Sequence, residues 1–208
     1  MEREIQQLIE RFSKRNIQGF YCPDKEEARQ ELLKLIPKAA SIGISGSVTL
    51  DAIGIAGNLE ARGNKVFNQY RPGLSREESL ELRKQGTQAD YYLASANAVS
   101  RNGELVFFSG YGNRIAGISC SKNVIVVCGI NKIVADLSQA IKRSREFATP
   151  LNCKRLNWQS ACLEDGICRD SACLAPEFKR MCCQVLVIES EVAIGRLKVI
   201  LVGEKLGF

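Results

Sequence analysis

The sequence predicts an α/β fold with a mostly parallel sheet flanked by helices. Two continuous apolar runs, 105–108 and 124–128, have the length of strands and are bounded by Gly or Asn, which is typical of strands buried on both faces. Strand-like runs alternate with helical patterns from residue 20 to 147, as they do in parallel sheets. Two further strands, 184–189 and 196–202, are expected to return to the sheet edge as an antiparallel pair.

The individual elements follow from periodicity and capping signals. Residues 2–16 place apolar side chains at helical spacing. Asp24 and Ser75 each precede a Glu by three residues, which is the reciprocal capping pattern that opens a helix. The expected helices cover 2–16, 24–35, 50–60, 75–86 and 132–147, and the remaining strands cover 20–22, 39–44, 65–68 and 90–93.

The chain of 208 residues is expected to form a single domain, because 45% of its residues are hydrophobic and can supply a sizeable core. Composition changes near residue 148, where six of the nine cysteines and the only Trp gather in a stretch with little periodicity. The expected parts are N-terminal helices (1–38), an α/β body (39–147), a cysteine-rich excursion (148–183) and C-terminal strands (184–208).

The absence of histidine from the sequence excludes several kinds of chemistry. Ser-His-Asp and Cys-His catalysis and every His-ligated metal site are impossible in this chain. Acid–base work must therefore fall to Asp, Glu, Lys, Tyr or Cys.

The charge and the cysteine content of the chain indicate its partners and its location in the cell. The net charge of +6 is dispersed, and no aromatic residues are interleaved with the basic ones, so nucleic acid is not expected as a partner. The N-terminal segment is charged and amphipathic, and no apolar run approaches the roughly 18 residues of a membrane span. An odd number of cysteines without a signal peptide favours reduced thiols, so we expect a soluble cytoplasmic protein.

Polar loops follow the expected strands, and they predict a pocket for an anionic small molecule. The carboxyl ends of parallel strands meet at one edge of the sheet, where ligands bind. Glycines let backbone N–H groups approach an anion, and Arg grips a carboxylate or phosphate with two hydrogen bonds. The predicted ligand-binding residues are Ser45, Gly46, Ser47, Thr49, Asn97, Gly103, Gly110, Gly112, Asn113, Arg114 and Lys132.

Structural explanations of the same residues remain open. Ser47 can serve only as a helix cap and Gly46 only as a turn residue. Arg114 can pair with a structural acid inside the domain. The segment is neither a Walker loop nor a dinucleotide-binding loop, because the Gly-Lys-Ser/Thr and Gly-x-Gly-x-x-Gly patterns are missing.

Glu104 is the candidate catalytic residue, because it directly follows the Asn102-Gly103 turn and starts a buried strand. Its role is implied by the family resemblance given below, since a carboxylate of the related enzymes acts as a nucleophile or abstracts a proton. The alternative is a solvated carboxylate at a strand end.

Four cysteines, Cys162, Cys168, Cys173 and Cys182, are candidate ligands of zinc or an iron–sulfur cluster. An aperiodic segment needs an anchor against its conformational entropy, and thiolate ligation couples metal binding to folding. Their spacing lacks the Cys-x-x-Cys pair of common zinc and ferredoxin motifs, so reduced structural thiols and redox-active or oxidised thiols remain alternatives.

Several motifs resemble the lactate-utilisation (LUD) domain family, in its short single-domain members that carry cysteines. They are Gly-Ser-Val-Thr at 46–49, Ala-Asn-Ala-Val-Ser-Arg-Asn-Gly-Glu-Leu-Val at 96–106, Gly-Tyr-Gly-Asn-Arg at 110–114, Val-Ile-Val-Val-Cys-Gly-Ile-Asn-Lys-Ile-Val at 124–134 and the ending Ile-Leu-Val-Gly-Glu-Lys-Leu-Gly-Phe at 200–208. The resemblance implies a fold related to sugar-phosphate isomerases, coenzyme A transferases and 5-formyltetrahydrofolate cyclo-ligases. It also implies a cytoplasmic role beside iron–sulfur redox subunits in the oxidation of L-lactate to pyruvate, or in a related organic-acid redox system.

Two classes of function are compatible with these features. One is a small-molecule enzyme of the coenzyme A transferase or cyclo-ligase type that acts on an anionic metabolite at the strand ends. The other is a non-catalytic partner subunit whose cysteine segment carries a metal or a cluster. The absorption spectrum of anaerobically purified protein distinguishes them, because only an iron–sulfur subunit absorbs in the visible range.

Overall fold

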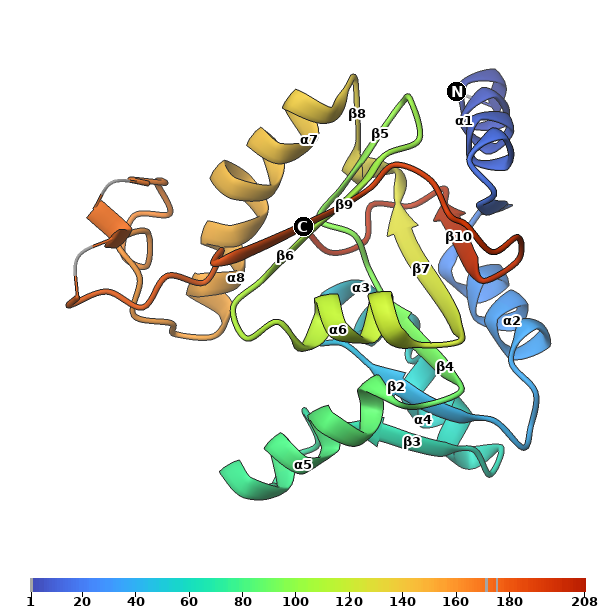
Figure 1. The fold of residues 1–208 in the computed structure, drawn as a ribbon, viewed down its shortest axis with the longest axis horizontal. Coiled ribbons are helices and arrows are strands. Elements are labelled where there is room, and N and C mark those ends of the chain that lie inside the picture. Colours follow the sequence, from blue (N-terminus) through green and yellow to red (C-terminus); the bar gives the residue numbers. More distant parts are fainter. Residues whose placement is uncertain (1, 171, 175) are drawn as a thin grey trace.

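The computed structural model describes residues 2–170, 172–174 and 176–208. Its main sheet has six strands, all parallel, in the order β1-β10-β7-β4-β2-β3 (Figure 1). These strands are β1 (Gln18–Cys22), β2 (Ser41–Ile44), β3 (Lys65–Asn68), β4 (Tyr91–Ala94), β7 (Asn123–Gly129) and β10 (Leu197–Val202). The expected α/β class with a mostly parallel sheet is confirmed.

A second, mixed sheet has the order β8-β5-β6-β9. Its strands are β5 (Ala98–Ser100), β6 (Leu105–Ser109), β8 (Ile133–Val134) and β9 (Gln184–Ile188). The expectation of an antiparallel C-terminal pair is wrong in its partners. β9 runs antiparallel to β6 in this sheet, whereas β10 lies between β1 and β7 in the main sheet and is parallel to both.

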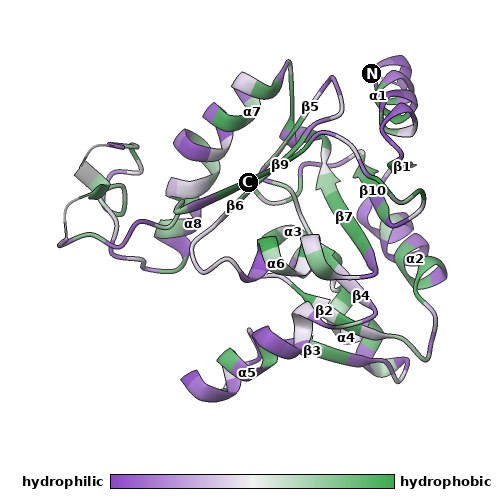
Figure 2. Cartoon of the chain, viewed as in Figure 1, coloured by the Kyte–Doolittle hydropathy of each residue, from purple (hydrophilic) through white to green (hydrophobic). Residues whose placement is uncertain are grey.

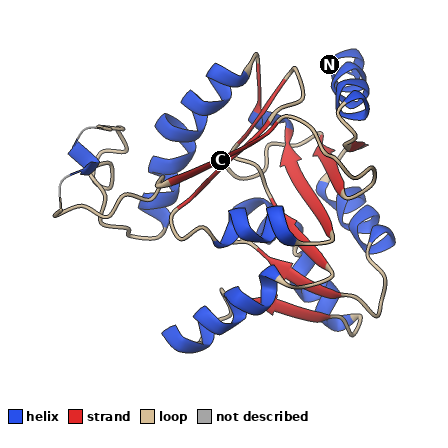
Figure 3. Ribbon diagram, in the orientation of Figure 1, coloured by secondary structure: helices blue, strands red, loops and turns tan. Residues whose placement is uncertain are grey.

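The helices cover the sheets and connect the strands (Figure 3). The α-helices are α1 (Glu2–Lys14), α2 (Lys25–Leu35), α3 (Val48–Ile53), α4 (Ile55–Ala61), α5 (Arg76–Thr87), α6 (Asn113–Cys120), α7 (Leu137–Arg143) and α8 (Thr149–Arg155), and shorter helical turns are η1 (Ile130–Lys132), η2 (Ser144–Ala148) and η3 (Ala172–Leu174). Asp24 caps α2, and Ser75 with Glu78 forms a complete capping box on α5, as the sequence predicts.

Two of the expected helices differ in their bounds. The helix expected over 50–60 is divided into α3 and α4 at Gly54, whose left-handed φ of 70° interrupts the helical path. The helix expected over 132–147 begins only at Leu137, because Ile133–Val134 first pairs with β5. It then continues through η2 into α8, with Pro150 in the first turn of α8.

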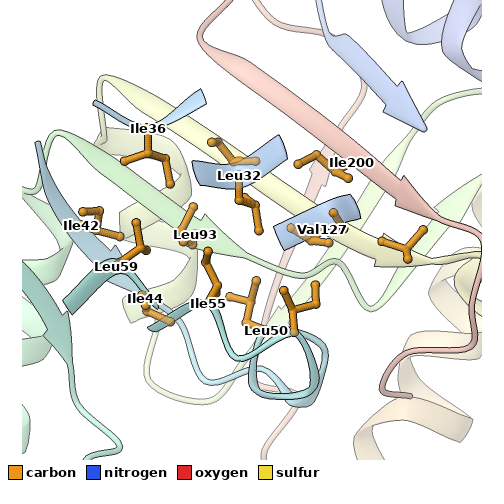
Figure 4. Packing of buried hydrophobic residues seen from close by; sticks show 14 of the residues in the cluster. Leu32, Ile36, Ile42, Ile44, Leu50, Ile55, Leu59, Leu93, Val127 and Ile200 are labelled. Atoms are coloured by element: carbon orange, nitrogen blue, oxygen red, sulfur yellow. The ribbon is translucent and has the colours of Figure 1, made fainter. Parts of the chain in front are cut away.

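The hydrophobic core lies on both faces of the main sheet, because successive side chains of a strand point to opposite sides. On one face, Leu32, Leu50 and Leu59 of the helices pack with strand residues such as Ile42 and Val127 (Figure 4).

On the other face, α1, α6 and the second sheet pack on the alternate residues of the same strands, including Val124 and Val126. Figure 2 shows this pattern as hydrophobic strands beneath helices with hydrophilic outer surfaces. Full burial of one aliphatic side chain stabilises the folded protein by about 1.5–3 kcal/mol. The two layers of buried side chains therefore hold the strands in place, and with them the strand ends that form the site.

Candidate functional site

A cavity of about 290 Å³ lies where four strands end. The loops after β2, β4 and β6 and the turn η1 after β7 all contribute to it, together with α8, the start of the cysteine-rich segment and the C-terminus. Its lining residues are Gly46, Ser47, Val48, Thr49, Tyr70, Arg83, Ser95, Ala96, Asn97, Phe108, Ser109, Gly110, Tyr111, Asn113, Arg114, Lys132, Thr149, Asn152, Arg155, Leu156, Trp158, Met181, Gly207 and Phe208. It therefore occupies the edge of the sheet at which α/β proteins bind ligands.

Arg114, in the first turn of α6, holds together the loops that surround the cavity. Its guanidinium donates hydrogen bonds to the backbone oxygen of Gly46 at 2.7 Å, to Asn97 Oδ1 at 3.2 Å and to the backbone oxygen of Phe108 at 3.3 Å. Burial lowers the pKa of the guanidinium. All three acceptors are neutral, and among the described residues no ion pair of Arg114 with a carboxylate is present.

Lys132 is almost fully buried, with 3% of its surface exposed. Its Nζ donates hydrogen bonds to Ser95 Oγ at 2.9 Å, Thr49 Oγ1 at 3.0 Å and the backbone oxygen of Ala96 at 3.2 Å. Burial lowers the pKa of this ammonium to about 8. Its three acceptors are neutral, so the charge of Lys132 is solvated by dipoles and not by an opposite charge.

Two further arginines line the cavity near its aromatic residues. Arg83 of α5 lies over the ring of Tyr111, with its guanidinium carbon 4.8 Å from the ring centre. Tyr111 and Trp158 are perpendicular to each other, with ring centres 5.6 Å apart. The charge of Arg155 acts against the burial that raises the pKa of Asp51, so Arg155 is partly balanced by that carboxyl group.

The charged side chains that line the cavity are all basic. Arg83, Arg114, Lys132 and Arg155 line it, and no Asp or Glu in the described part of the chain does. A buried charge without an opposite partner is costly for a folded protein. The arrangement is therefore suited to a ligand that brings negative charge into the cavity.

The structure brings most of the predicted ligand-binding residues together. Gly46, Ser47, Thr49, Asn97, Gly110, Asn113, Arg114 and Lys132 all line the cavity. Ser47 also caps α3 by accepting a hydrogen bond from Leu50 N at 3.2 Å. The ring of Tyr70 lies so close to Gly46 that a Cβ there would be 2.4 Å from it. Ser47 is therefore a helix cap and Gly46 a tightly packed turn residue, and both also line the cavity.

Three other predicted residues do not line the cavity. Ser45 is buried behind it, with a hydroxyl that has no hydrogen-bond partner in the described structure. Gly112 has a φ of 78° at the start of α6, and a Cβ there would meet Gln184. Gly103 has a φ of 100° in the turn between β5 and β6, close to Arg15.

Glu104 also lies outside the cavity, at the opposite end of β6 from Ser109. Its Oε1 accepts a hydrogen bond from Arg15 Nη2 at 2.7 Å, and its Oε2 accepts a hydrogen bond from the hydroxyl of Ser100. The Arg15 guanidinium also donates hydrogen bonds to the backbone oxygens of Asn102 and Glu189. The carboxylate thus holds α1 against the β5–β6 turn, and no lining residue stands next to it.

Several lining residues are not among those predicted from the sequence. Tyr70, Arg83, Arg155, Trp158 and Met181 come from helices and irregular segments, and Phe208 is the last residue of the chain. Tyr70 lies in the loop after β3, so the strand-following signal applies to it although the prediction omitted it. The other residues do not follow a strand directly. Their places depend on how α5 and α8 pack, which no local pattern states.

The four candidate metal ligands surround one very small cavity together with Cys153. All of the cysteines are free, and burial raises the pKa of Cys168 and Cys182 and raises that of Cys153 to about 12. The described residues include no group of three or more Cys, Asp or Glu side chains arranged to hold a metal ion. The cavity that these cysteines surround has a volume of about 10 Å³. Metal ligation therefore stays a prediction without structural support.

Comparisons with known proteins agree with this architecture. A family model described as the LUD domain matches residues 5–202. A solved structure of a DUF162 family protein from Deinococcus radiodurans is similar over 97% of both chains, with a TM-score of 0.56 and 14% identity. Among curated proteins none matches.

Two further solved structures align with part of this chain. Ribose 5-phosphate isomerase A from Neisseria gonorrhoeae aligns over 54% of both chains, with a TM-score of 0.35 and 18% identity. The eIF2B beta subunit from Chaetomium thermophilum aligns over 65% of this chain and 44% of its own, with a TM-score of 0.33 and 22% identity. No helix in the described part of the chain is long and apolar enough to cross a membrane.

Proposed function

The chain belongs to the LUD domain family, and we propose that it binds an anionic organic acid in the cavity at the strand ends. The family relation supports a role in lactate utilisation, in which L-lactate is oxidised to pyruvate, or in a related organic-acid redox system. In this proposal the protein works in the cytoplasm beside iron–sulfur redox subunits, and its own contribution is to hold the acid.

One observation carries the proposal. Arg114 and Lys132 line the same cavity, and the hydrogen-bond acceptors of both are neutral in the described structure. A bound carboxylate would supply the missing negative charge, and hydrogen bonds between charged groups are stronger than those to neutral partners. The thiol and carboxylate nucleophiles of a transferase have no counterpart among the described lining residues, so binding of the acid is the better-supported function.

Calorimetric titration of the purified protein with L-lactate and with pyruvate tests this function. Replacing Arg114 with Met removes the guanidinium, and we expect the affinity to fall roughly ten- to one-hundredfold, the range for a lost charged hydrogen bond. Arg76→Met is the matched control, because Arg76 is exposed on α5 and does not line the cavity.

The variant also loses three hydrogen bonds within the protein, so circular dichroism must show that it is folded before titration. Arg114→Lys provides a second variant that keeps the charge but lacks the planar geometry for a two-point grip. Unchanged affinity in a folded Arg114→Met protein would refute the proposed site.

A further inference from the structure

From the walls of the cavity we infer that its ligand carries a planar ring beside the anionic group, and that Tyr111 and Trp158 hold this ring at the mouth. The inference rests on the proposed function, because it assumes that an anion occupies the inner part. It goes beyond that function by naming the class of organic acid.

The mouth of the cavity is aromatic. Tyr111 and Tyr70 expose 64% and 47% of their surface, although both line the cavity. Leu156 and Trp158, also lining residues, follow α8 at the same opening. Aromatic side chains that remain exposed around a cavity offer faces and edges on which another ring can pack.

The orientation of these rings is fixed before any ligand binds. The Trp158 indole donates its Nε1–H to the backbone oxygen of Lys179, and the ring stands perpendicular to that of Tyr111. Arg83 covers the ring of Tyr111 and leaves less freedom for it to turn. A ligand ring therefore meets a preformed surface and causes little loss of side-chain entropy.

The polar and aromatic parts lie at different depths. Lys132 is buried among Thr49, Ser95 and the backbone of Ala96, whereas Tyr111 is largely exposed. A ligand that uses both must have its negative charge at one end and its ring at the other. A small acid without a ring reaches only the inner part.

The volume supports a ligand of two such parts. A cavity of roughly 150 Å³ holds one benzene molecule, and the volume here is about 290 Å³. L-Lactate has about as many non-hydrogen atoms as benzene, so it would fill only about half of the space. An acid head joined to one six-membered ring matches the whole cavity.

Phenyllactate and L-lactate form the decisive pair, because they have the same 2-hydroxy acid head and differ only in the ring. We expect phenyllactate to bind roughly tenfold more tightly, from ring packing and from the apolar area that the ring buries. Calorimetry gives both affinities. Trp158, the only Trp of the chain, gives an independent signal, since its fluorescence should change with phenyllactate more than with L-lactate.

Tyr111→Ala tests where the ring binds. The ratio of the two affinities should fall toward one in this variant, because the preference arises from the aromatic surface. Tyr21→Ala is the control, since Tyr21 is similarly exposed at 43% but lies outside the cavity, and it should keep the ratio.

A second pair of probes distinguishes the kind of anion. If phenyl phosphate binds tightly and inorganic phosphate does not, the ring requirement holds with a phosphate head in place of a carboxylate. Equal affinities of phenyllactate and L-lactate in the unmodified protein would overturn the inference and leave the proposed function intact. Failure of all four anions to bind would overturn both.

Discussion

Lys132 is the residue whose protonation controls the charge at the inner end of the cavity. In an unfolded chain its pKa is about 10.5, and burial lowers it to about 8 in the folded protein. A bound anion stabilises the ammonium form and so raises the pKa again. Binding of the ligand and binding of this proton are therefore linked.

The linkage predicts the pH dependence of ligand affinity. Below pH 8 Lys132 is protonated before the anion binds, and the full affinity is present. Above pH 8 the free protein loses this proton, so the affinity should fall by up to about tenfold per pH unit until the pKa of the complex is reached. Titrations of L-lactate or phenyllactate between pH 7 and 9.5 measure this change.

Lys132→Met should bind the anion more weakly and with a flatter dependence on pH over the same range. Comparing this variant with the unmodified protein shows whether the pH dependence arises from Lys132 or from another titratable group beside it. Cys128 is such a group, and burial raises its pKa. An affinity that stays constant from pH 7 to 9.5 in the unmodified protein would show that Lys132 does not contact the charge of the ligand.

The sequence was sufficient to find many residues of the cavity that follow strands, although Tyr70 after β3 and Ser95 after β4 were not among those predicted. Asn97 and Lys132 follow β4 and β7, and parallel strands of one sheet must end on the same side. Arg114 follows β6 of the mixed second sheet, to which this rule does not apply. The same rule does not place Glu104, which begins its strand and so lies at the other end. Arg83 and Trp158 have no local signal, because their positions result from packing between distant segments.

At the scale of elements, two ion pairs join α1 and the residue after it to the β5–β6 turn, Arg101 with Glu4 at 3.4 Å and Arg15 with Glu104 at 2.7 Å. The side chains of Arg15 and Glu104 are 26% and 12% exposed, and the guanidinium and carboxylate also bond to Asn102 and Ser100. A partly buried pair of this kind contributes more than a surface salt bridge, because its loss leaves a charged group without its partner.

Replacing Glu104 with Gln should therefore lower the free energy of unfolding by roughly 1–3 kcal/mol. Ligand affinity should stay within about twofold, because Glu104 does not line the cavity. Urea unfolding and calorimetric titration measure the two quantities, with the exposed Glu77→Gln as the control. A large loss of affinity at unchanged stability would instead assign Glu104 a direct functional role.

The two C-terminal strands show which features of an element its own residues encode. Leu197–Val202 is buried along nearly its whole length, as the apolar run predicts for an inner strand, and Gln184–Ile188 is partly exposed, as an edge strand should be. Their sequences give strand type but not partners, because pairing is set by the sheets already present. The antiparallel arrangement of β9 with β6 could therefore not be read from this segment alone.

The contacts of the cysteine-rich segment also cannot be predicted from its own sequence. Five of its six cysteines surround one small cavity: the four candidate ligands and Cys153 of α8, a fifth thiol that spacing alone does not predict. Trp158 and Met181 of this segment form part of the cavity wall. The segment thus contributes to the candidate site through packing, which its irregular sequence does not reveal.

At the scale of the whole molecule, the order of the strands explains why the cavity exists. β7, β4 and β2 are neighbours in the main sheet, and their carboxyl ends carry Lys132, Ser95 and Ser47 to one edge. The second sheet packs on one face of the first, and the end of β6 leads into the loop before Arg114. Figure 1 shows that the chain after α8 projects beyond α8, on the opposite side of the view from α1 and α2.

The most direct test of the account is a crystal structure of the protein grown with selenate, an anion whose selenium atom is located by anomalous scattering. The account predicts a strong anomalous peak inside the cavity, within hydrogen-bond distance of the Arg114 guanidinium and the Lys132 ammonium. A cavity without selenate, in crystals where the anion occupies only surface sites, would contradict the claim that these two buried cations form an anion-binding site.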